Sequence, residues 1–329
     1  MEELLKFAPR PTGAGDMFQL LRDGQPRTRA DLAAITGQAR STIAARIDLL
    51  MTAGLIAPAG EASSTGGRPP VTFAFSPEAR IVLAVDLGAT HARLAVTDLA
   101  SNVLAETDAA LAIADGPDVV LSWVADTGEK LVATTGRSID DLVSVGVGLP
   151  GPVEHSSGRP INPPIMPAWD DVDVPGILQK RFDASVLVDN DVNIMALGEH
   201  RTAWPAVTDM LFVKVATGIG SGIIADGELR RGAQGAAGDI GHVAVPSAAD
   251  VPCRCGNVGC LEAVASGQAV AAALAAAGLD APPSSAVVAL VRGGDLAASQ
   301  AVLQAGREIG SVLGACVGLL NPSLIVNGG

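Results

Sequence analysis

The stretch IVLAVDLGAT, residues 81–90, decides the fold class. Residues 81–85 are all apolar, as in a buried strand, and Asp86 follows near the strand end, ahead of Gly88 and the hydroxyl of Thr90. A carboxylate, a glycine turn and a hydroxyl in this order can hold a Mg²⁺-bound phosphate against backbone N–H groups. Taken alone, the stretch is equally typical of an ordinary β-hairpin.

Two later strand ends carry residues of the same kind. The apolar run 186–188 ends in DNDVN, residues 189–193, which gathers carboxylates and amides where a strand gives way to a helix. The strand-like run 211–215 leads into ATGIGSG, residues 216–222, a second phosphate-type turn. Ligands of α/β sheets bind at such strand ends. The set resembles a sugar kinase of the actin-like ATPase (ribonuclease H-like) type, which implies an α/β fold of two lobes with a cleft between them.

The first eighty residues differ from the rest in charge. The net charge of the chain is −13, to which residues 1–80 contribute +1 and the remainder −14. This asymmetry indicates a small neutral-to-basic module joined to a large acidic one. We expect one domain over residues 1–78 and a second over 79–329, the latter with lobes at about 79–190 and 191–329.

Three short helical patterns follow one another in the first domain. The second begins at a Thr28 cap, with Asp31 three residues later, and stops at Gly37; the third runs from about 39 to 53. The apolar positions of the three patterns are Met17, Leu20 and Leu21, then Leu32 and Ile35, then Ile43, Ile47 and Leu50. Two short helices, a glycine turn and a third helix are typical of a helix-turn-helix module.

Small polar and arginine side chains near the start of the third helix would let it enter the major groove of DNA. Strand-like residues 55–56 and 71–75 flank a Gly/Pro-rich segment and predict a wing, whose tip Gly67-Arg68-Pro69 suits an A·T-rich minor groove. The alternatives are a generic three-helix packing unit and a flexible linker. The candidate DNA-binding residues are Gln38, Arg40, Ser41, Thr42, Arg46, Gly67 and Arg68.

Three of the four cysteines gather in one short segment. Cys253, Cys255 and Cys260 fall within eight residues, and His242 lies upstream. In a cytoplasmic protein such clustering indicates metal rather than a disulfide, and four N/S ligands predict a closed, structural zinc site. Buried thiols without metal are the alternative. Cys316, alone in an apolar stretch, is expected in the core.

With these motifs in this order, residues 14–329 resemble the ROK family of repressors, open reading frames and sugar kinases. The repressor branch of that family carries a winged helix-turn-helix ahead of the kinase-like fold. The resemblance implies that Asn190 and Asp191 contact a sugar and that Asp191 would be the general base of a kinase. The other residues that match its sugar contacts are Gly158, Arg159, Asn162, Asp239, His242 and Glu262. Those of its phosphate- or ATP-binding turns are Asp86, Gly88, Thr90, Thr217, Gly218 and Gly220.

The sequence departs from the family pattern at three places. His91 stands where the kinases usually have Lys or Asn, and Asp239 stands for a Glu that is one methylene longer. The sequence stops at Asn327-Gly328-Gly329, where family members continue through another helical stretch, so the C-terminus is expected to be truncated.

These features leave three functions open. The first is a sugar-responsive transcriptional repressor of carbohydrate-metabolism genes, which would bind operator DNA, a sugar or sugar-phosphate effector and structural zinc. The second is an ATP-dependent sugar kinase, glucokinase-like or N-acylhexosamine kinase-like, which would also need Mg-ATP. The third is a scaffold with a vestigial pocket.

Location and assembly complete the expectations. Residues 1–11 lack the long apolar core of a signal peptide, and no run reaches the ~20 apolar residues of a membrane span. We therefore expect a cytoplasmic protein without membrane contact. We expect a homodimer or a higher homo-oligomer, because one winged domain reads only a half-site.

Overall fold

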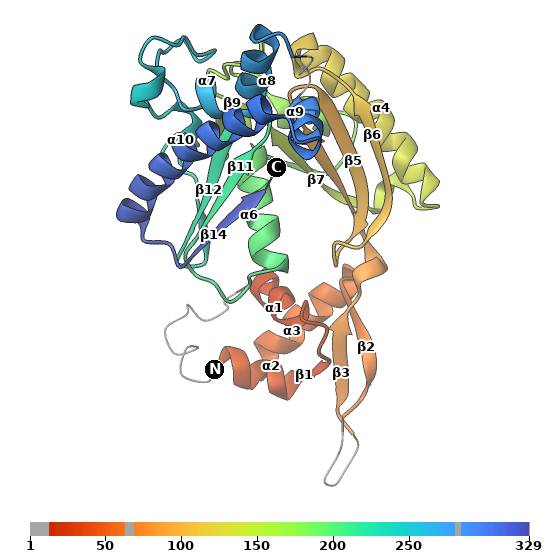
Figure 1. Ribbon diagram of the computed structural model, residues 1–329. Helices are drawn as coiled ribbons and strands as arrows, with labels where there is room; N and C mark the ends of the chain where they lie inside the picture. Colours follow the sequence, from red (N-terminus) through yellow and green to blue (C-terminus); the bar gives the residue numbers. More distant parts are fainter. Residues whose placement is uncertain (1–12, 63–68, 280–283, 329) are drawn as a thin grey trace. The chain divides into compact units, whose positions relative to one another are not determined.

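The computed structural model describes residues 13–62, 69–279 and 284–328 (Figure 1), apart from the side chains of residues 284 and 285. The chain forms two compact units. One contains Met1–Leu83 together with Ala95–Glu106 and Leu131–Val143, and the other contains Ala84–Leu94, Thr107–Lys130 and Ser144–Gly329.

Three helices and a three-stranded sheet make up the N-terminal part of the first unit (Figure 1). The helices are α1 (Ala14–Leu21), α2 (Arg29–Thr36) and α3 (Arg40–Thr52), and the strands are β1 (Arg27–Thr28), β2 (Ile56–Glu61) and β3 (Val71–Phe75). The sheet order is β1-β3-β2, with both pairs antiparallel. The predicted helices and the predicted hairpin are confirmed.

The local signals act as the sequence predicts. The Thr28 hydroxyl accepts the Asp31 N–H, and the Asp31 carboxylate accepts the Thr28 N–H, so the start of α2 is capped from both sides. Gly37 ends α2 in the left-handed conformation at φ +69°. Ile35, expected as an apolar position of this helix, is 46% exposed, and the buried position goes to Thr36 instead. The Thr36 hydroxyl donates to the Leu32 carbonyl, which satisfies it there.

One apolar core holds this part together. It contains Met17, Leu21, Leu32, Ile43, Ile47, Leu50, Ile56 and Phe73, all of them buried. Phe18 and Phe75 pack edge to face beside it with ring centroids 5.3 Å apart, and the Arg29 guanidinium lies 4.6 Å from the centre of the Phe73 ring.

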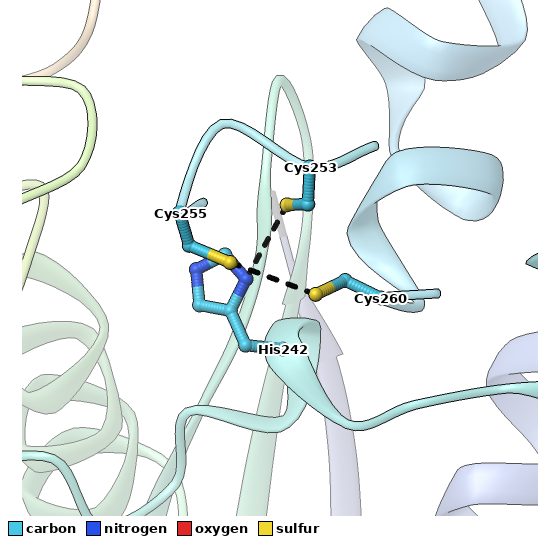
Figure 2. A group of neighbouring side chains, drawn as sticks. All are labelled: His242, Cys253, Cys255 and Cys260. Atoms are coloured by element: carbon cyan, nitrogen blue, oxygen red, sulfur yellow. Dashed lines mark hydrogen bonds between the residues drawn. The ribbon is translucent and has the colours of Figure 1, made fainter. Parts of the chain in front are cut away.

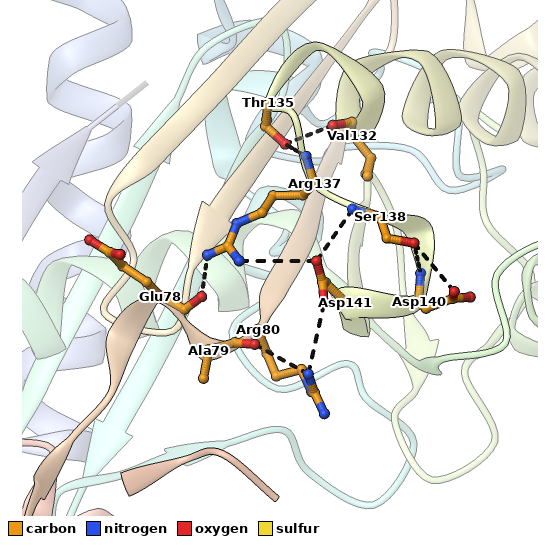
Figure 3. A network of polar contacts seen from close by, with 9 residues as sticks. All are labelled: Glu78, Ala79, Arg80, Val132, Thr135, Arg137, Ser138, Asp140 and Asp141. Atoms are coloured by element: carbon orange, nitrogen blue, oxygen red, sulfur yellow. Dashed lines mark hydrogen bonds and ion pairs between the residues drawn. The ribbon is translucent and has the colours of Figure 1, made fainter. Parts of the chain in front are cut away.

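A polar network holds the residues that come directly after β3 in the chain (Figure 3). The Arg137 guanidinium donates to the Glu78 carbonyl, and its other terminal nitrogen lies 4.0 Å from the Asp141 carboxylate. Arg80 approaches the same carboxylate at 3.8 Å. These contacts anchor the short segment that connects β3 with the next strand.

The longest sheet has five strands in the order β10-β7-β4-β5-β6. Their bounds are β4 (Ile81–Leu87), β5 (His91–Asp98), β6 (Val103–Ala110), β7 (Leu142–Leu149) and β10 (Ser185–Asn190). Strands β10 and β7 are parallel, from Ser185 opposite Ser144 to Asn190 opposite Leu149. Helices α4 (Pro117–Thr134) and α5 (Val174–Gln179) and the small hairpin of β8 (Val153–Glu154) and β9 (Arg159–Pro160) belong to the same stretch of chain.

A second sheet has four strands in the order β13-β12-β11-β14. The strands are β11 (Met210–Val215), β12 (Ile219–Ala225), β13 (Glu228–Arg230) and β14 (Leu324–Gly328). The helices around it are α6 (Asp191–Thr202), α7 (Glu262–Ala265), α8 (Gly267–Ala276), α9 (Ser284–Arg292) and α10 (Leu296–Leu320). Short 3-10 helices cover Pro77–Ala79, Ile113–Asp115, Ile139–Asp141, Ile240–His242 and Pro246–Ala248.

Strand β11 is buried on both faces because its side chains alternate between two cores. Met210 and Phe212 pack with Val192 and Ala196 of α6. Leu211 and Val213 pack with residues of α7, α8, α9 and α10. Helix α6 approaches β12 so closely that a Cβ on Gly222 would lie 2.4 Å from the Cβ of Ala196.

No single helix among the described residues is long and apolar enough to cross a membrane. The pair Ala286–Arg292 and Leu296–Leu320, bent by 114° at its break, meets the length and composition test only when the two segments are taken together.

Candidate functional site

A cavity of about 340 Å³ opens in the second compact unit, within the usual range for small-molecule pockets. It lies where the strand ends singled out in the sequence come together. The predicted residues that line it are Asp86, Gly88, Asn190, Asp191, Thr217, Gly218, Gly220, Asp239, His242 and Glu262.

The candidate base Asp191 is the first residue of α6 and is only 6% exposed. One carboxylate oxygen accepts the Val192 N–H at 2.8 Å, and the other accepts the Lys214 ammonium at 2.7 Å. Lys214 also lines the cavity and keeps 23% of its side chain exposed. The side chain expected to take a proton from a sugar therefore lies in an ion pair.

Asn190 caps α6 and reaches across the cavity wall. Its side-chain oxygen accepts the N–H groups of Val192 and Asn193, and its amide nitrogen donates to the Gly151 carbonyl at 3.0 Å. Among the described residues the second N–H of this amide has no acceptor, so it is a donor for a ligand.

The neighbouring Asp189, buried at 5% exposure, holds this strand end in place. Its carboxylate accepts the Asn190 N–H at 2.8 Å, the Asn193 amide at 3.0 Å and Nε of Arg231 at 2.7 Å. Nδ1 of His155 lies 3.5 Å from the same carboxylate. Asp189 thus ties the start of α6 to the segment that follows β13.

At the first phosphate-type turn, the His91 ring lies directly against Gly88. A Cβ on Gly88 would come within 2.3 Å of Cε1 of His91. Asp86 reaches the cavity from β4, and burial together with the negative charge of Asp191 raises its pKa, against the opposing effect of Lys214.

At the second phosphate-type turn, the Glu262 carboxylate accepts the Ile219 N–H at 3.0 Å. A Cβ on Gly218 would lie 2.6 Å from that carboxylate oxygen, so a larger residue there would displace the Glu262 side chain. The turn that would cradle a phosphate in a kinase here holds a carboxylate of the protein itself.

His242, Cys253, Cys255 and Cys260 come together beside the cavity (Figure 2). Their four ligand atoms all lie within 4.8 Å of one another. Nδ1 of His242 is 3.6 Å from Sγ of Cys253, and Sγ of Cys255 is 3.6 Å from Sγ of Cys260. Tetrahedral zinc with its usual bond lengths places ligand atoms roughly 3.5–3.8 Å apart, so the group fits this ion.

Tight turns present these ligands. The Cys253 N–H donates to the Asn257 carbonyl and the Gly256 N–H to the Cys253 carbonyl, which closes a loop over residues 253–257 that carries the first two cysteines. Gly256 takes φ +90°, a conformation that favours glycine. Burial, together with the neighbouring sulfur atoms of Cys255 and Cys253, raises the pKa of Cys260 to about 12, so this thiol stays protonated unless a cation is bound.

Four predicted residues do not line the cavity. Arg159 is ion-paired with Asp171 at 3.1 Å and with Asp173 at 3.6 Å. Gly158 packs under Pro175, the Asn162 N–H donates to Asp170, and Thr90 lies in the first turn with an exposed side chain.

The candidate DNA-binding residues lie around the start of α3. Arg40 and Ser41 are exposed, whereas Thr42 is half-buried. Arg46 is half-buried as well and donates to the side-chain oxygen of Gln38. Gly67 and Arg68 fall outside the described residues.

Sequence reasoning missed two residues of this region, Lys214 and Arg231, and it included Asp189 in the polar stretch 189–193 without giving it a role. A lone lysine inside an otherwise apolar strand was the available signal for Lys214. Arg231 offered none, because only the fold brings it to Asp189.

Comparison with known proteins gives one family and several relatives. A family model described as the ROK family matches residues 82–329. The "Xylose repressor" of Caldicellulosiruptor bescii is 27% identical over 326 residues, which cover 95% of this chain and 81% of that protein.

Two solved structures are also similar. A ROK family transcriptional regulator, a homolog of the E. coli MLC protein, superposes with a TM-score of 0.79 at 27% identity, over 96% of this chain and 82% of that one. The ROK hexokinase from Thermus thermophilus gives a TM-score of 0.61 at 31% identity, over 76% and 81% of the two chains.

Proposed function

The chain belongs to the ROK family, and on that premise we propose that it is a sugar-responsive, DNA-binding transcriptional regulator that represses carbohydrate-metabolism genes. The effector is a sugar or a sugar phosphate. One observation carries this proposal: the similarity to the xylose repressor and to the ROK transcriptional regulator extends over 95–96% of the chain, and so includes residues ahead of the family model.

Residues 1–78 act in this proposal as a winged helix-turn-helix domain, and residues 79–329 as the ligand-binding domain. Helix α3 is the recognition helix, which presents Arg40, Ser41 and Thr42, and the β2–β3 hairpin is the wing. The exposure of Arg40 and Ser41 at the start of α3 supports this assignment, because side chains there can reach the major groove. The protein binds its operator as a homodimer or a higher homo-oligomer.

We assign structural zinc to His242, Cys253, Cys255 and Cys260. With Nδ1 of His242 toward the cysteines, its Nε2 lies 4.0 Å from the Asp239 carboxylate, which lines the cavity. A metal on Nδ1 fixes the orientation of the ring, so zinc would hold Nε2 of His242 in place to contact the ligand.

The ligand-binding residues in this proposal are Asn190, Asp191, Asp239, His242 and Glu262, since all five line the cavity. The match of Gly158, Arg159 and Asn162 to the family pattern makes these three further sugar contacts, for which the loop that carries them would have to move.

An ATP-dependent sugar kinase is the second candidate, favoured by the 31% identity to a ROK hexokinase and by Asp191 at the wall of the cavity. In that function Asp191 would accept the proton of a sugar hydroxyl, and Mg-ATP would supply the phosphoryl group.

A mobility-shift titration tests the proposal. The full chain is titrated against DNA from upstream of its own gene, alone and with D-xylose, D-glucose, N-acetyl-D-glucosamine and their phosphates. We expect specific binding that at least one of these compounds weakens. Absence of specific binding, or binding that none of the compounds changes, contradicts the proposal. Phosphoryl transfer from Mg-ATP to a sugar in the same preparation would favour the kinase.

A further inference from the structure

We propose that Lys214 is a ligand-contacting, specificity-determining residue of the cavity: its ammonium group and the Asp191 carboxylate together bind one hydroxyl of an uncharged sugar. This inference deepens the proposed function and rests on it for the statement that the cavity takes a sugar.

The fold holds Lys214 firmly at the edge of the cavity. It lies on β11, between β12 and β14, opposite Gly220 on one side and Gly328 on the other. Met210 and Phe212, at alternate positions of the same strand, face α6, so Lys214 is the next residue of that row and meets Asp191 at the start of the helix. A side chain fixed in this way needs little reorganisation to meet a ligand.

Lys214 and Asp191 have hydrogen-bond donors and acceptors that their contact with each other does not use. An ammonium group has three donors, and in the described part of the chain that of Lys214 makes one hydrogen bond, to Asp191. The carboxylate oxygens of Asp191 accept one donor each in the described residues, and each oxygen can take two. A sugar hydroxyl both donates and accepts, so it can donate to Asp191 and accept from Lys214 at the same time.

The charges around the pair favour an uncharged ligand. Four carboxylates line the cavity, those of Asp86, Asp191, Asp239 and Glu262, against one lysine and one arginine, Lys214 and Arg254. The Lys214 charge is already balanced by Asp191 at 2.7 Å. A phosphate brought to this wall would meet the three remaining carboxylates, those of Asp86, Asp239 and Glu262, against the single guanidinium of Arg254, and like charges repel strongly in a partly buried site.

Side chains of the protein itself contact both turns that would seat a phosphate. The His91 ring lies against Gly88, and the Glu262 carboxylate takes the Ile219 N–H. A phosphate oxygen at the second turn would have to compete with Glu262 for that N–H.

The direct test is calorimetric titration of the zinc-loaded full chain without DNA. The probes are D-xylose, D-glucose and N-acetyl-D-glucosamine, each beside its terminal phosphate ester. We expect at least one neutral sugar to bind, and its phosphate to bind at least about tenfold more weakly. A phosphate that binds as tightly as its parent sugar, or failure of all three neutral sugars to bind, overturns the proposal. This comparison needs no variant.

Lys214→Met keeps the length of the side chain and removes its charge, and Lys180→Met, at an exposed lysine, is the matched control. Loss of a charged hydrogen bond should weaken binding of the neutral sugar by about tenfold or more in Lys214→Met and leave Lys180→Met unchanged. Unaltered zinc content and melting temperature show that the variants fold. Wild-type sugar affinity in Lys214→Met overturns the proposal.

A double-mutant cycle separates a shared hydroxyl from two independent contacts. If Lys214 and Asp191 bind the same hydroxyl, Lys214→Met in the Asp191→Asn background should cost much less affinity than in the wild type. Additive losses contradict the shared contact. If the sugar results are as expected but no sugar changes operator affinity, the proposed function fails while the assignment of Lys214 stands.

Discussion

At the scale of single residues, the metal ligands give the sharpest expectation. Purified protein should carry one zinc ion per chain, and Cys255→Ser should lose it, because three ligands hold zinc far more weakly than four. The same variant should bind sugar more weakly, since zinc fixes the His242 ring beside the cavity. Metal analysis by mass spectrometry and sugar titration measure both effects.

Cys316→Ser is the control for that variant, because Cys316 lies in α10 and outside the cluster. It should keep its zinc. Full zinc occupancy in Cys255→Ser would disprove the assignment.

Arg40 allows a second test at this scale. It is exposed at the first position of α3, so Arg40→Ala should weaken operator binding and lower the slope of log affinity against log salt by about 1, as expected for one lost phosphate contact. Arg292→Ala removes an exposed arginine from α9 and should change neither quantity. Equal salt slopes for Arg40→Ala and the wild type would show that Arg40 makes no phosphate contact and would contradict the assignment of α3 as the recognition helix.

What the sequence could predict at this scale depended on local spacing. The four candidate metal ligands could be grouped from the sequence because three cysteines lie within eight residues, and the Asn190-Asp191 pair because a strand visibly ends there. Lys214 was missed because its role comes from a partner 23 positions away, and the spacing of residues along a strand does not reveal what lies across from it. The same holds for Arg231 and Asp189, which are 42 positions apart.

At the scale of elements, Gly37 is the position where backbone geometry alone makes a prediction. It ends α2 at φ +69°, so Gly37→Ala should lower the stability of the helical part by about 1 kcal/mol through left-handed strain. Gly15→Ala is the matched control: Gly15 lies within α1 with open space around its Cα, and alanine there should be neutral or slightly stabilising. Thermal unfolding monitored by circular dichroism measures both, and a melting temperature unchanged by Gly37→Ala would refute the strain.

Helices and strands were predictable where caps and periodicity agree. Thr28, Asp31 and Gly37 bound α2 as expected, and the three apolar residues on one face of α3 are all buried. The exception is Ile35, which was expected to be buried but is exposed, because tertiary packing buries the neighbouring Thr36 instead. Loops were harder: nothing in the sequence could show that Arg159 pairs with Asp171 and Asp173, because two ion pairs formed by turn residues decide where that side chain points.

At the scale of the whole molecule, charge is divided in the way a DNA-binding regulator needs. Residues 1–80 carry +1 while the rest carries −14. An acidic ligand-binding part is repelled by the phosphate backbone, so DNA can meet only the N-terminal residues productively. Uneven charge of this kind limits non-specific binding without weakening the intended contacts.

The last prediction is thermodynamic coupling between operator and sugar. If the sugar changes operator affinity by some factor, the operator must change sugar affinity by the same factor, and ~1–3 kcal/mol of coupling corresponds to roughly 5- to 150-fold.

Arg137 anchors the segment after β3 through the Glu78 carbonyl and the Asp141 carboxylate. We expect an anchored segment to transmit a displacement from one end to the other, which a flexible linker would not do. Arg137→Ala should therefore reduce the coupling factor while each ligand alone still binds. Calorimetric titrations of sugar with and without operator, and of operator with and without sugar, give the two factors independently. A factor of 1 in both titrations would show that the two ligands are not coupled, and undiminished coupling in Arg137→Ala would exclude this anchor as the connection.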